Sequence, residues 1–366
     1  MEDMTYVNRK GTVWTHRRSR NLGIAIVLMS VLAGCGVAGS GNSGSSAGGS
    51  ASGSDLKVIW QPGDEQPFYY ADAKNLWHDY GIAPQLIQVQ QGTAELAALA
   101  SKSADIALLG PGPFVSGVSK NIDMVAIYPT VDFASLEGLY VSPASGIKQL
   151  SDLVGKTVAV PFGSSADTGL RFALAKAGIP ADKVGIQNIT PTAMLAGFTG
   201  GDVQAAYIWS TWGQRLIAAG AKLVTTDKAA GVNAGPTIVA VRSAYLKSHP
   251  KIVACFIAAM NAGAIGANTN AEVAAKGLEE YTKVTPEQAL TIAKSEHSLT
   301  IDEALSPTGA FSLVNNESGL PPLLGDVAKQ LLTENLITSV PNDVGAYVSA
   351  MPAKQAQAMK PNGSCE

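Results

Sequence analysis

The hydrophobic positions of this chain follow two periods, and the clearest change from one to the other lies near its middle. Residues 157–160 form an apolar, β-branched run that Pro161 and Gly163 end, which predicts a strand followed by a tight turn. From Ser165 onward the period becomes helical, because apolar residues recur at offsets of three, four and seven, at Leu170, Ala173, Leu174 and Ala177. Gly178 then predicts the end of this helix.

Strand and helix patterns of this kind alternate along most of the chain. Before the central stretch they predict strands at 56–61, 85–90, 105–109, 124–128 and 137–141, and helices at 67–80 and 93–102. After it they predict strands at 184–189, 203–209, 222–225 and 236–242, helices at 192–198 and 211–219, and a long helix from Pro250. Residues 271–359 read mainly as helices. This alternation predicts an α/β fold with mostly parallel sheets.

Ligands of such sheets bind where the strands end, so the turns that follow strands are candidate binding segments. These turns are residues 61–66, 110–113 and 161–165. In the last of them Ser164 and Ser165 lie where a helix N-terminus leaves N–H groups unpaired and carries partial positive charge. Such a corner can bind an oxyanion without a lysine. The alternative is that one of these serines only caps the helix.

The N-terminal residues read as an export signal. Residues 1–20 are basic, and the uncharged run at 22–33 is too short for an ordinary membrane-spanning helix but fits a signal peptide. The sequence Leu-Ala-Gly-Cys that ends at Cys35 resembles the bacterial lipobox. We therefore expect a lipoprotein signal peptide at 1–34 and acyl chains on Cys35 that anchor the protein to the outer face of the cell membrane. The alternative is an ordinary secretory signal with a chance cysteine nearby.

Residues 35–54 are almost wholly glycine, serine and alanine, which predicts a flexible tether with a reach of about 25 Å. The remaining residues, 55–366, are enough for two lobes.

Charge and composition exclude several classes of function. The chain has 26 basic and 29 acidic residues, a formal net charge of −3, and the basic residues cluster in the leader, so we expect no nucleic-acid partner. His78, His249 and His297 are not at metal-ligand spacing, and there is no phosphate-binding loop or dinucleotide motif. We therefore expect no metal, no cofactor and no catalytic residues. An exported chain permits a disulfide between Cys255 and Cys365, but the spacing gives it no support, and we expect Cys255 to be a small core residue.

A resemblance to a known family becomes specific in the central stretch. Residues 152–165, Asp-Leu-Val-Gly-Lys-Thr-Val-Ala-Val-Pro-Phe-Gly-Ser-Ser, resemble a segment of the taurine- and aliphatic-sulfonate-binding proteins of ABC importers, a group that includes nitrate-binding relatives. Residues 200–209, 234–237 and 245–250 follow in the family's order, and weaker similarity runs from about 56 to about 348.

The resemblance implies a two-lobed type II periplasmic-binding-protein fold, with a ligand cleft between the lobes. The first lobe would comprise residues 55–141 and 236–366, and the second lobe residues 142–235. Strands near 139–141 and 237–241 would cross between the lobes as a hinge.

In the family, hydroxyls and backbone N–H groups hold the negative head group of the ligand. Carried over to this sequence, the resemblance points to Ser164, Ser165 and the turn at Gly110, and Trp209 and Thr237 fall on matching cleft segments. The turns that follow strands add Gln61, Glu65 and Gly112, so the candidate ligand-binding residues are Gln61, Glu65, Gly110, Gly112, Ser164, Ser165, Trp209 and Thr237. Tyr207 alternates with Trp209 along a strand, so we expect one of the two to face the core.

The sequence also departs from the family. The turn Gly110-Pro111-Gly112-Pro113 lacks the hydroxyls that relatives have there, and Pro111 lacks a backbone donor. Taurine-binding relatives carry an aspartate after Pro236 and Thr237, where this chain has Ile238. Three acids are best placed to replace that aspartate, although each could instead be a solvated or helix-capping acid: Glu65, Asp132 and Asp167.

These features together predict a lipid-anchored, monomeric substrate-binding protein of an ABC importer. It would capture a small anionic or zwitterionic organic solute, such as taurine or another alkanesulfonate, and deliver it to the permease without catalysing a reaction. One alternative is an enzyme on the same fold that makes a thiamine pyrimidine or acts on sulfur compounds. Others are a receptor for nitrate or for an aromatic or pyrimidine solute, and a surface lipoprotein that binds a host or matrix protein.

Overall fold

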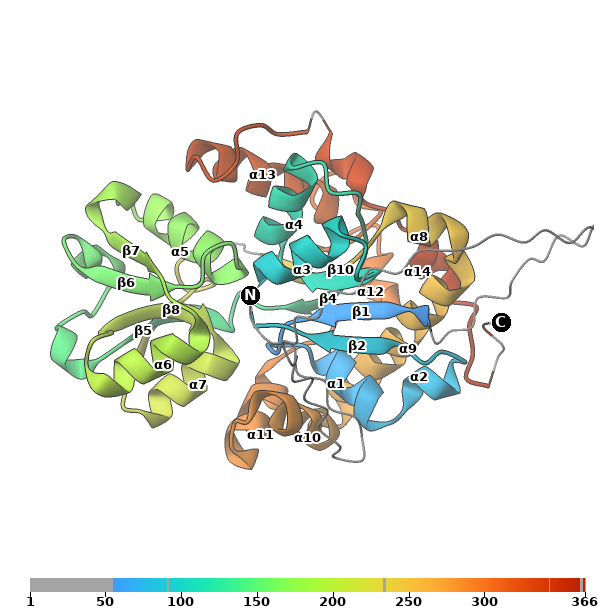
Figure 1. Cartoon of the computed structure of the whole chain (residues 1–366), viewed down its shortest axis with the longest axis horizontal. Helices are drawn as coiled ribbons and strands as arrows, with labels where there is room; N and C mark the ends of the chain where they lie inside the picture. The colour runs from blue at the N-terminus through green and yellow to red at the C-terminus, as the bar shows by residue number, and fades with distance from the viewer. Residues whose placement is uncertain (1–54, 91, 233–234, 342, 363–364, 366) are drawn as a thin grey trace, which may run out of the picture. The chain divides into compact units, whose positions relative to one another are not determined.

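The computed structural model describes residues 55–90, 92–232, 235–341, 343–362 and 365. The predicted signal peptide, the lipobox cysteine Cys35 and the tether lie outside these residues. The described part contains two five-stranded sheets with helices packed against them (Figure 1). The prediction of an α/β fold is therefore confirmed.

The first sheet has the strand order β2-β1-β3-β10-β4. Its strands are β1 (Lys57–Trp60), β2 (Gln85–Gln88), β3 (Ile106–Leu109), β4 (Val125–Asp132) and β10 (Pro236–Val241). Strand β1 is parallel to β2 and β3, whereas β10 runs antiparallel between β3 and β4. The helices that connect these strands are α1 (Gln66–Ala73), α2 (Leu76–Asp79), α3 (Gly92–Ala100) and α4 (Pro111–Ser119). We call this sheet with its helices the first lobe.

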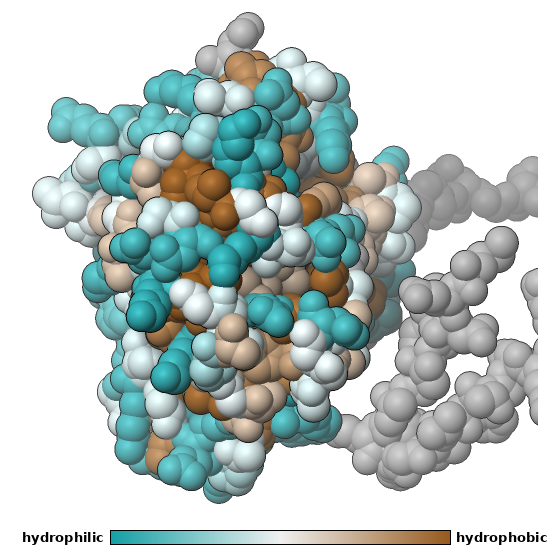
Figure 2. Space-filling model, turned by 90° about the vertical axis from the view of Figure 1, so that its left-hand side faces the viewer, coloured by the Kyte–Doolittle hydropathy of each residue, from teal (hydrophilic) through white to brown (hydrophobic). Residues whose placement is uncertain are grey.

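The second sheet repeats this plan with the order β7-β6-β8-β5-β9. Its strands are β5 (Glu137–Val141), β6 (Thr157–Val160), β7 (Gly185–Asn188), β8 (Ala205–Trp209) and β9 (Lys222–Thr226). Its helices are α5 (Ser165–Lys176), α6 (Pro191–Gly200) and α7 (Ser210–Ala218). On the face of this second lobe that Figure 2 shows, hydrophobic residues form small patches among polar ones, as is typical of water-exposed protein surfaces.

The chain beyond β10 is helical and covers the first lobe. Its helices are α8 (Ser243–Ser248), α9 (Pro250–Thr269), α10 (Ala271–Thr282), α11 (Pro286–Ser295), α12 (Ile301–Ala304), α13 (Leu320–Thr333) and α14 (Met351–Ala356). Helix α9 is long and apolar enough to cross a membrane, but 67% of its apolar window is buried inside the protein, against α1 and α14 among others. It is therefore the core helix of the first lobe. Four short 3₁₀ helices complete the described elements, at Pro143–Ser145, Leu150–Leu153, Ala181–Lys183 and Val344–Tyr347.

The structure corrects the predicted hinge. The two strands expected to cross between the lobes are present, but β5 pairs with β8 and β9 of the second sheet, and β10 pairs with β3 and β4 of the first. Each of the two strands therefore lies within a single sheet and does not cross between the lobes. The chain instead crosses between Asp132 and Glu137 and returns between Thr226 and Pro236, so residues 137–141 belong to the second lobe.

Two local expectations also change. The helix predicted at 67–80 is two helices, because Asn75 adopts a left-handed conformation with φ of 56° and breaks the chain direction between α1 and α2. Cys255 and Cys365 form a disulfide, with Cα atoms 6.3 Å apart across a sequence separation of 110 residues. The chain end returns to the first lobe, where the N–H of Asn362 donates to the carbonyl oxygen of Asp79 at 2.6 Å. The spacing of the cysteines in the sequence carries no sign of this return.

Candidate functional site

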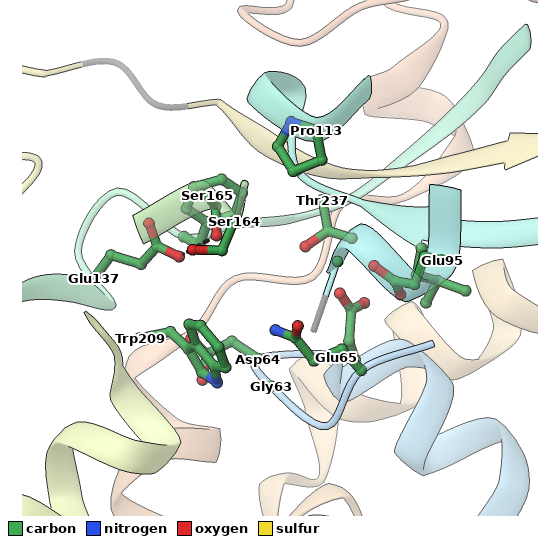
Figure 3. Close-up of a pocket in the computed structure, with 15 residues that line it drawn as sticks. Gly63, Asp64, Glu65, Glu95, Pro113, Glu137, Ser164, Ser165, Trp209 and Thr237 are labelled. Carbon is green, nitrogen blue, oxygen red and sulfur yellow. Dashed lines mark hydrogen bonds between the residues drawn. The ribbon is translucent and has the colours of Figure 1, made fainter. Parts of the chain in front are cut away.

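A small cavity lies between the two lobes. The space open to the centre of a water molecule is about 50 Å³, several times the ~10–15 Å³ that one water needs. We call it the interlobe cavity and define it by its lining residues, many of which Figure 3 shows: Gln61, Gly63, Asp64, Glu65, Gly92, Glu95, Leu108, Gly110, Pro113, Phe133, Glu137, Ser164, Ser165, Trp209 and Thr237.

The three turns that the sequence singled out all contribute to this lining. Residues 61–66 follow β1, residues 110–113 follow β3, and residues 161–165 follow β6. The carboxyl ends of parallel strands meet at one edge of a sheet, and the edges of the two sheets face each other across the cavity.

Seven of the eight candidate ligand-binding residues line the interlobe cavity, and one does not. Gly112 lies instead in the first turn of α4, facing Thr168 of α5. A Cβ atom at Gly112 would lie 2.1 Å from the Thr168 Oγ1 atom, and one at Gly110 would lie 3.0 Å from the Ser165 Cβ atom. Both glycines therefore allow the backbone of the first lobe to approach the second lobe closely.

The two serines at the N-terminus of α5 are both engaged within the protein. The Ser164 hydroxyl accepts from the N–H of Asp167 at 3.3 Å and donates to the carbonyl oxygen of Pro161 at 2.6 Å. The capping interpretation is thus confirmed for Ser164. The Ser165 hydroxyl donates to the carboxyl group of Glu137. The first-turn N–H groups of Ser165 and Ala166 remain without an intrahelical partner, as at any helix N-terminus.

Three carboxyl groups of the first lobe face the cavity. Burial raises the pKa of Glu65 to about 8, although its side chain accepts from the Thr130 hydroxyl at 3.2 Å. Burial also raises the pKa of Glu95 well above its ordinary value, and the charge of Glu65 adds to this shift. Burial raises the pKa of Asp64 to about 7, against the hydrogen bond that Ser210 donates to it.

The loop that carries two of these acids is held by a tyrosine of α1. The Tyr69 hydroxyl donates to the carbonyl oxygen of Gly63 at 2.9 Å and accepts from its N–H at 3.2 Å. This pair of bonds fixes the backbone immediately before Asp64 and Glu65. The two residues are 6% and 5% exposed, so both are buried in the protein interior.

One carboxyl group of the second lobe faces the cavity. Glu137 begins β5, and burial raises its pKa well above its ordinary value, with a further contribution from the charge of Asp227. Asp227 accepts a hydrogen bond from the Tyr207 hydroxyl. Tyr207 is therefore the core member of the alternating pair, and Trp209 is the member that faces the cavity, where its indole N–H has no partner.

Three of the four acids are not among the predicted ligand-binding residues. Asp64 lies in the turn at 61–66, and Glu95 and Glu137 adjoin apolar positions in α3 and β5. The sign in the sequence that could have identified Glu95 and Glu137 is a single acidic residue beside the buried face of a helix or strand. Of the three acids proposed to replace the family's aspartate, only Glu65 lines the cavity.

The other two proposed acids have structural partners. The Asp132 carboxyl accepts from the N–H of Ala134 at 3.0 Å, within its own turn. Asp167 pairs with Arg171 at 2.9 Å and also accepts from the N–H of Gly163 at 3.1 Å.

Among the lining residues there is no histidine or cysteine, so the lining contains no pair of the kind that activates a serine or cysteine nucleophile. Within the described residues, no group of three or more histidine, cysteine, aspartate or glutamate side chains is arranged to hold a metal ion.

Known proteins are similar to this chain in sequence and in fold. The taurine-binding periplasmic protein of Escherichia coli (strain K12) is 29% identical over 205 residues, which cover 55% of this chain and 63% of that protein. The alkanesulfonate-binding protein SsuA from Xanthomonas axonopodis pv. citri, bound to MOPS, superposes with a TM-score of 0.68 at 18% identity and covers 80% of this chain and 97% of its own. The desulfurization enzyme DSZB superposes with a TM-score of 0.59 at 18% identity, covering 82% and 99%.

The structural matches establish the two-lobed type II periplasmic-binding-protein fold that the sequence predicted. The sequence also matches a family model over residues 64–274, more than half of the chain. With its paired sheets and the cavity between them, this chain belongs to the NMT1/THI5-like family.

Proposed function

We propose that this protein is the solute-binding component of an ABC importer. It captures a small anionic or zwitterionic organic solute between its lobes, with taurine and other alkanesulfonates as the first candidates, and delivers the solute to the permease. The observation that carries this proposal is the interlobe cavity, which is lined by polar groups and by residues of both lobes.

The geometry suits capture by closure. Because both lobes contribute lining residues, a bound solute contacts both at once and favours the closed arrangement over an open one. A permease can then distinguish the loaded protein from the empty one by the surface that closure creates. The names of the relatives, a taurine-binding and an alkanesulfonate-binding protein, support the same solute class.

An enzymatic function is the second candidate, since the desulfurization enzyme DSZB has the same fold. The lining residues offer carboxyl groups, hydroxyls and an indole, but no thiol or imidazole. We therefore propose that the protein releases its solute unchanged. Mass spectrometry of a solute after prolonged incubation with the purified protein tests this, and conversion of the solute by the protein alone would favour the enzyme.

A screen of solutes by thermal unfolding tests the binding function directly. A solute present at 100 times its Kd adds about 2.7 kcal/mol to the free energy of unfolding. The panel should contain sulfonates, sulfate, nitrate, carboxylates, amines and pyrimidines. We expect at least one organic solute to raise the melting temperature and to reduce the radius of gyration in solution scattering. A protein that responds to no solute of any class would contradict the proposal.

We also propose that the protein acts as a monomer on the outer face of the cell membrane, anchored through Cys35. The basic and apolar leader before this residue supports an exported lipoprotein. The Cys35→Ser variant should lose its acyl chains and appear in the soluble extracytoplasmic fraction. A variant that stays membrane-bound and is processed like the wild type would contradict the anchor and leave the solute-binding proposal untouched.

A further inference from the structure

The charge balance of the interlobe cavity is one-sided. Its lining includes four acids and, among the described residues, no lysine, arginine or histidine. The acids are Asp64, Glu65, Glu95 and Glu137, each at most 6% exposed. A solute with only negative charge would therefore enter a site that offers no opposite charge to balance it.

The four acids are distributed along the cavity. Figure 3 shows the side chains of Glu65 and Glu95 at one end, near Thr237, and Glu137 at the other end beside Ser164 and Ser165. The charge of Glu65 contributes to the raised pKa of Glu95, which agrees with their proximity. Glu65 and Glu95 thus form a carboxyl pair on the wall of the first lobe.

Several buried atoms of this lining have no partner within the protein. Among them, Oε1 of Glu95 and Oε2 of Glu137 accept no hydrogen bond, although each side chain is only 2% exposed. Buried polar atoms without a partner are rare in folded proteins. In an ionised carboxylate both oxygens are acceptors, so the partner that each would then lack is a donor, and an ammonium or amidinium group carries only donors.

At the opposite end of the cavity, fewer hydroxyl donors are free to bind an anion than the sequence predicted. The Ser164 hydroxyl is used by the backbone of its own turn, and the Ser165 hydroxyl donates to Glu137. A negatively charged group would find the first-turn N–H groups of α5, but with the Glu137 carboxyl beside them. The α5 N-terminus can accommodate such a group without selecting strongly for it.

We propose that the solute is recognised through a positively charged nitrogen group, held between the carboxyl groups of Glu65 and Glu95. This inference rests on the proposed solute-binding function and narrows its substrate class to amines, including zwitterions such as taurine, in preference to sulfonates without a basic nitrogen. The nitrogen group supplies the missing donor to Glu95 and the opposite charge to both acids. It also reverses the effect of burial, because a cation between the carboxyl groups lowers their pKa values.

Two matched pairs of probes test this without altering the protein. Taurine and isethionate share a two-carbon sulfonate and differ in an ammonium against a hydroxyl group. Ethylammonium and ethanesulfonate separate the two charges. By calorimetry we expect taurine to bind more tightly than isethionate by roughly tenfold or more, the ratio of one charged hydrogen bond. By thermal unfolding at millimolar concentration, we expect ethylammonium to stabilise the protein more than ethanesulfonate does.

The Glu95→Gln variant tests the residue assignment. It keeps the shape of the side chain and removes its charge, so taurine should bind roughly ten- to a hundredfold more weakly while isethionate changes little. Glu280→Gln is the matched control, because Glu280 is exposed on α10 and does not line the cavity. Should Glu95→Gln fail to fold, Glu65→Gln makes the same test on the other member of the pair.

Equal affinity for taurine and isethionate in the wild type would overturn the inference. So would a taurine-to-isethionate ratio that Glu95→Gln and Glu65→Gln both leave unchanged. Binding of sulfonates or other solutes with no response to any amine would overturn this inference alone. No response to any solute class would overturn the proposed function as well.

Discussion

The hydroxyl group of Ser210 donates a hydrogen bond to the carboxyl group of Asp64, and this bond joins the two lobes. Ser210 is the first residue of α7 in the second lobe, and Asp64 lies in the loop before α1 in the first. Each residue is only 6% exposed. The bond is therefore shielded from water and forms only when the lobes are closed together.

Removal of this bond should shift the protein toward an open form. In the Ser210→Ala variant we expect the best solute of the panel to bind about two- to tenfold more weakly, since a hydrogen bond of this kind contributes about 0.5–1.5 kcal/mol. Calorimetry measures the affinity, and solution scattering of the solute-free variant should give a larger radius of gyration. Ser151→Ala, an exposed serine of the second lobe, is the control. Unchanged affinity would show that this bond does not stabilise the closed form.

A larger side chain at Gly112 should obstruct closure by steric conflict. The added Cβ atom of Gly112→Ala would meet the Thr168 hydroxyl and Cβ atom at 2.1 and 2.9 Å, across the lobe boundary. Solute affinity should fall by at least about tenfold. The first lobe should not lose stability, because alanine is favoured over glycine in a helix by about 1 kcal/mol.

Helix α13 provides a matched control for this variant. Gly325 is also helical, and a Cβ atom there would have no neighbour within 4 Å. Gly325→Ala should therefore leave solute affinity unchanged. Equal effects of the two variants on binding would contradict the steric explanation.

The buried carboxyl groups should make the solute-free protein less stable as pH rises. Burial raises the pKa of Glu65 from 4.5 to about 8, so the folded state holds a proton that the unfolded state has lost between these values. The free energy of unfolding should then fall by about 1.4 kcal/mol per pH unit for each such group. The other acids with raised pKa values around this site act in the same direction: Asp64, Glu95, Glu137, Asp227 and Glu296.

The Glu65→Gln variant removes one of these groups and should flatten the pH dependence by about 1.4 kcal/mol per unit between about pH 5 and about pH 8. Urea unfolding at several pH values measures the slope. Tyr69 also faces this site, but burial keeps its pKa well above this range. Glu280→Gln controls for the loss of one negative charge. A slope identical to that of the wild type would show that Glu65 is ionised in the folded protein.

The disulfide between Cys255 and Cys365 should stabilise the first lobe. It closes a loop of 110 residues and ties the chain end to the core helix α9. Reduction, or the Cys365→Ser variant, should lower the free energy of unfolding by about 2–5 kcal/mol. Urea unfolding with and without dithiothreitol measures this, and the variant should be insensitive to the reductant. Equal stability of the oxidised and reduced wild type would contradict a stabilising role.

Local sequence patterns predicted the elements and the edge of the sheets where the cavity lies. The turn from Pro161 to Ser165 is an example, because an apolar run, a proline, a glycine and a serine cap are all local signals. The turns at residues 61–66 and 110–113 were predicted to line the cavity by the same rule, that ligands bind where parallel strands end. This prediction does not require knowing which strands pair, because parallel strands present their carboxyl ends at one edge of the sheet.

Features set by contacts between distant residues could not be predicted in this way. The placement of β5 and β10 depends on pairing partners far along the chain, and the disulfide depends on the return of the chain end. Glu95 and Glu137 were missed for a related reason. Each is a single acid next to apolar neighbours, and only the packing of the lobes shows that its carboxyl group faces the cavity instead of water.

The position of β10 also sets an order for folding. Strand β10 lies between β3 and β4, so the first sheet is incomplete until the chain beyond the second lobe has been synthesised. The second sheet uses one continuous segment, from β5 to β9, and can form as soon as that segment is available. A nascent chain thus carries an unfinished first lobe for as long as the second lobe takes to emerge. Until β10 is in place, the edge of β3 that faces away from β1 has no strand to pair with, and an unpaired edge of this kind can pair with other chains.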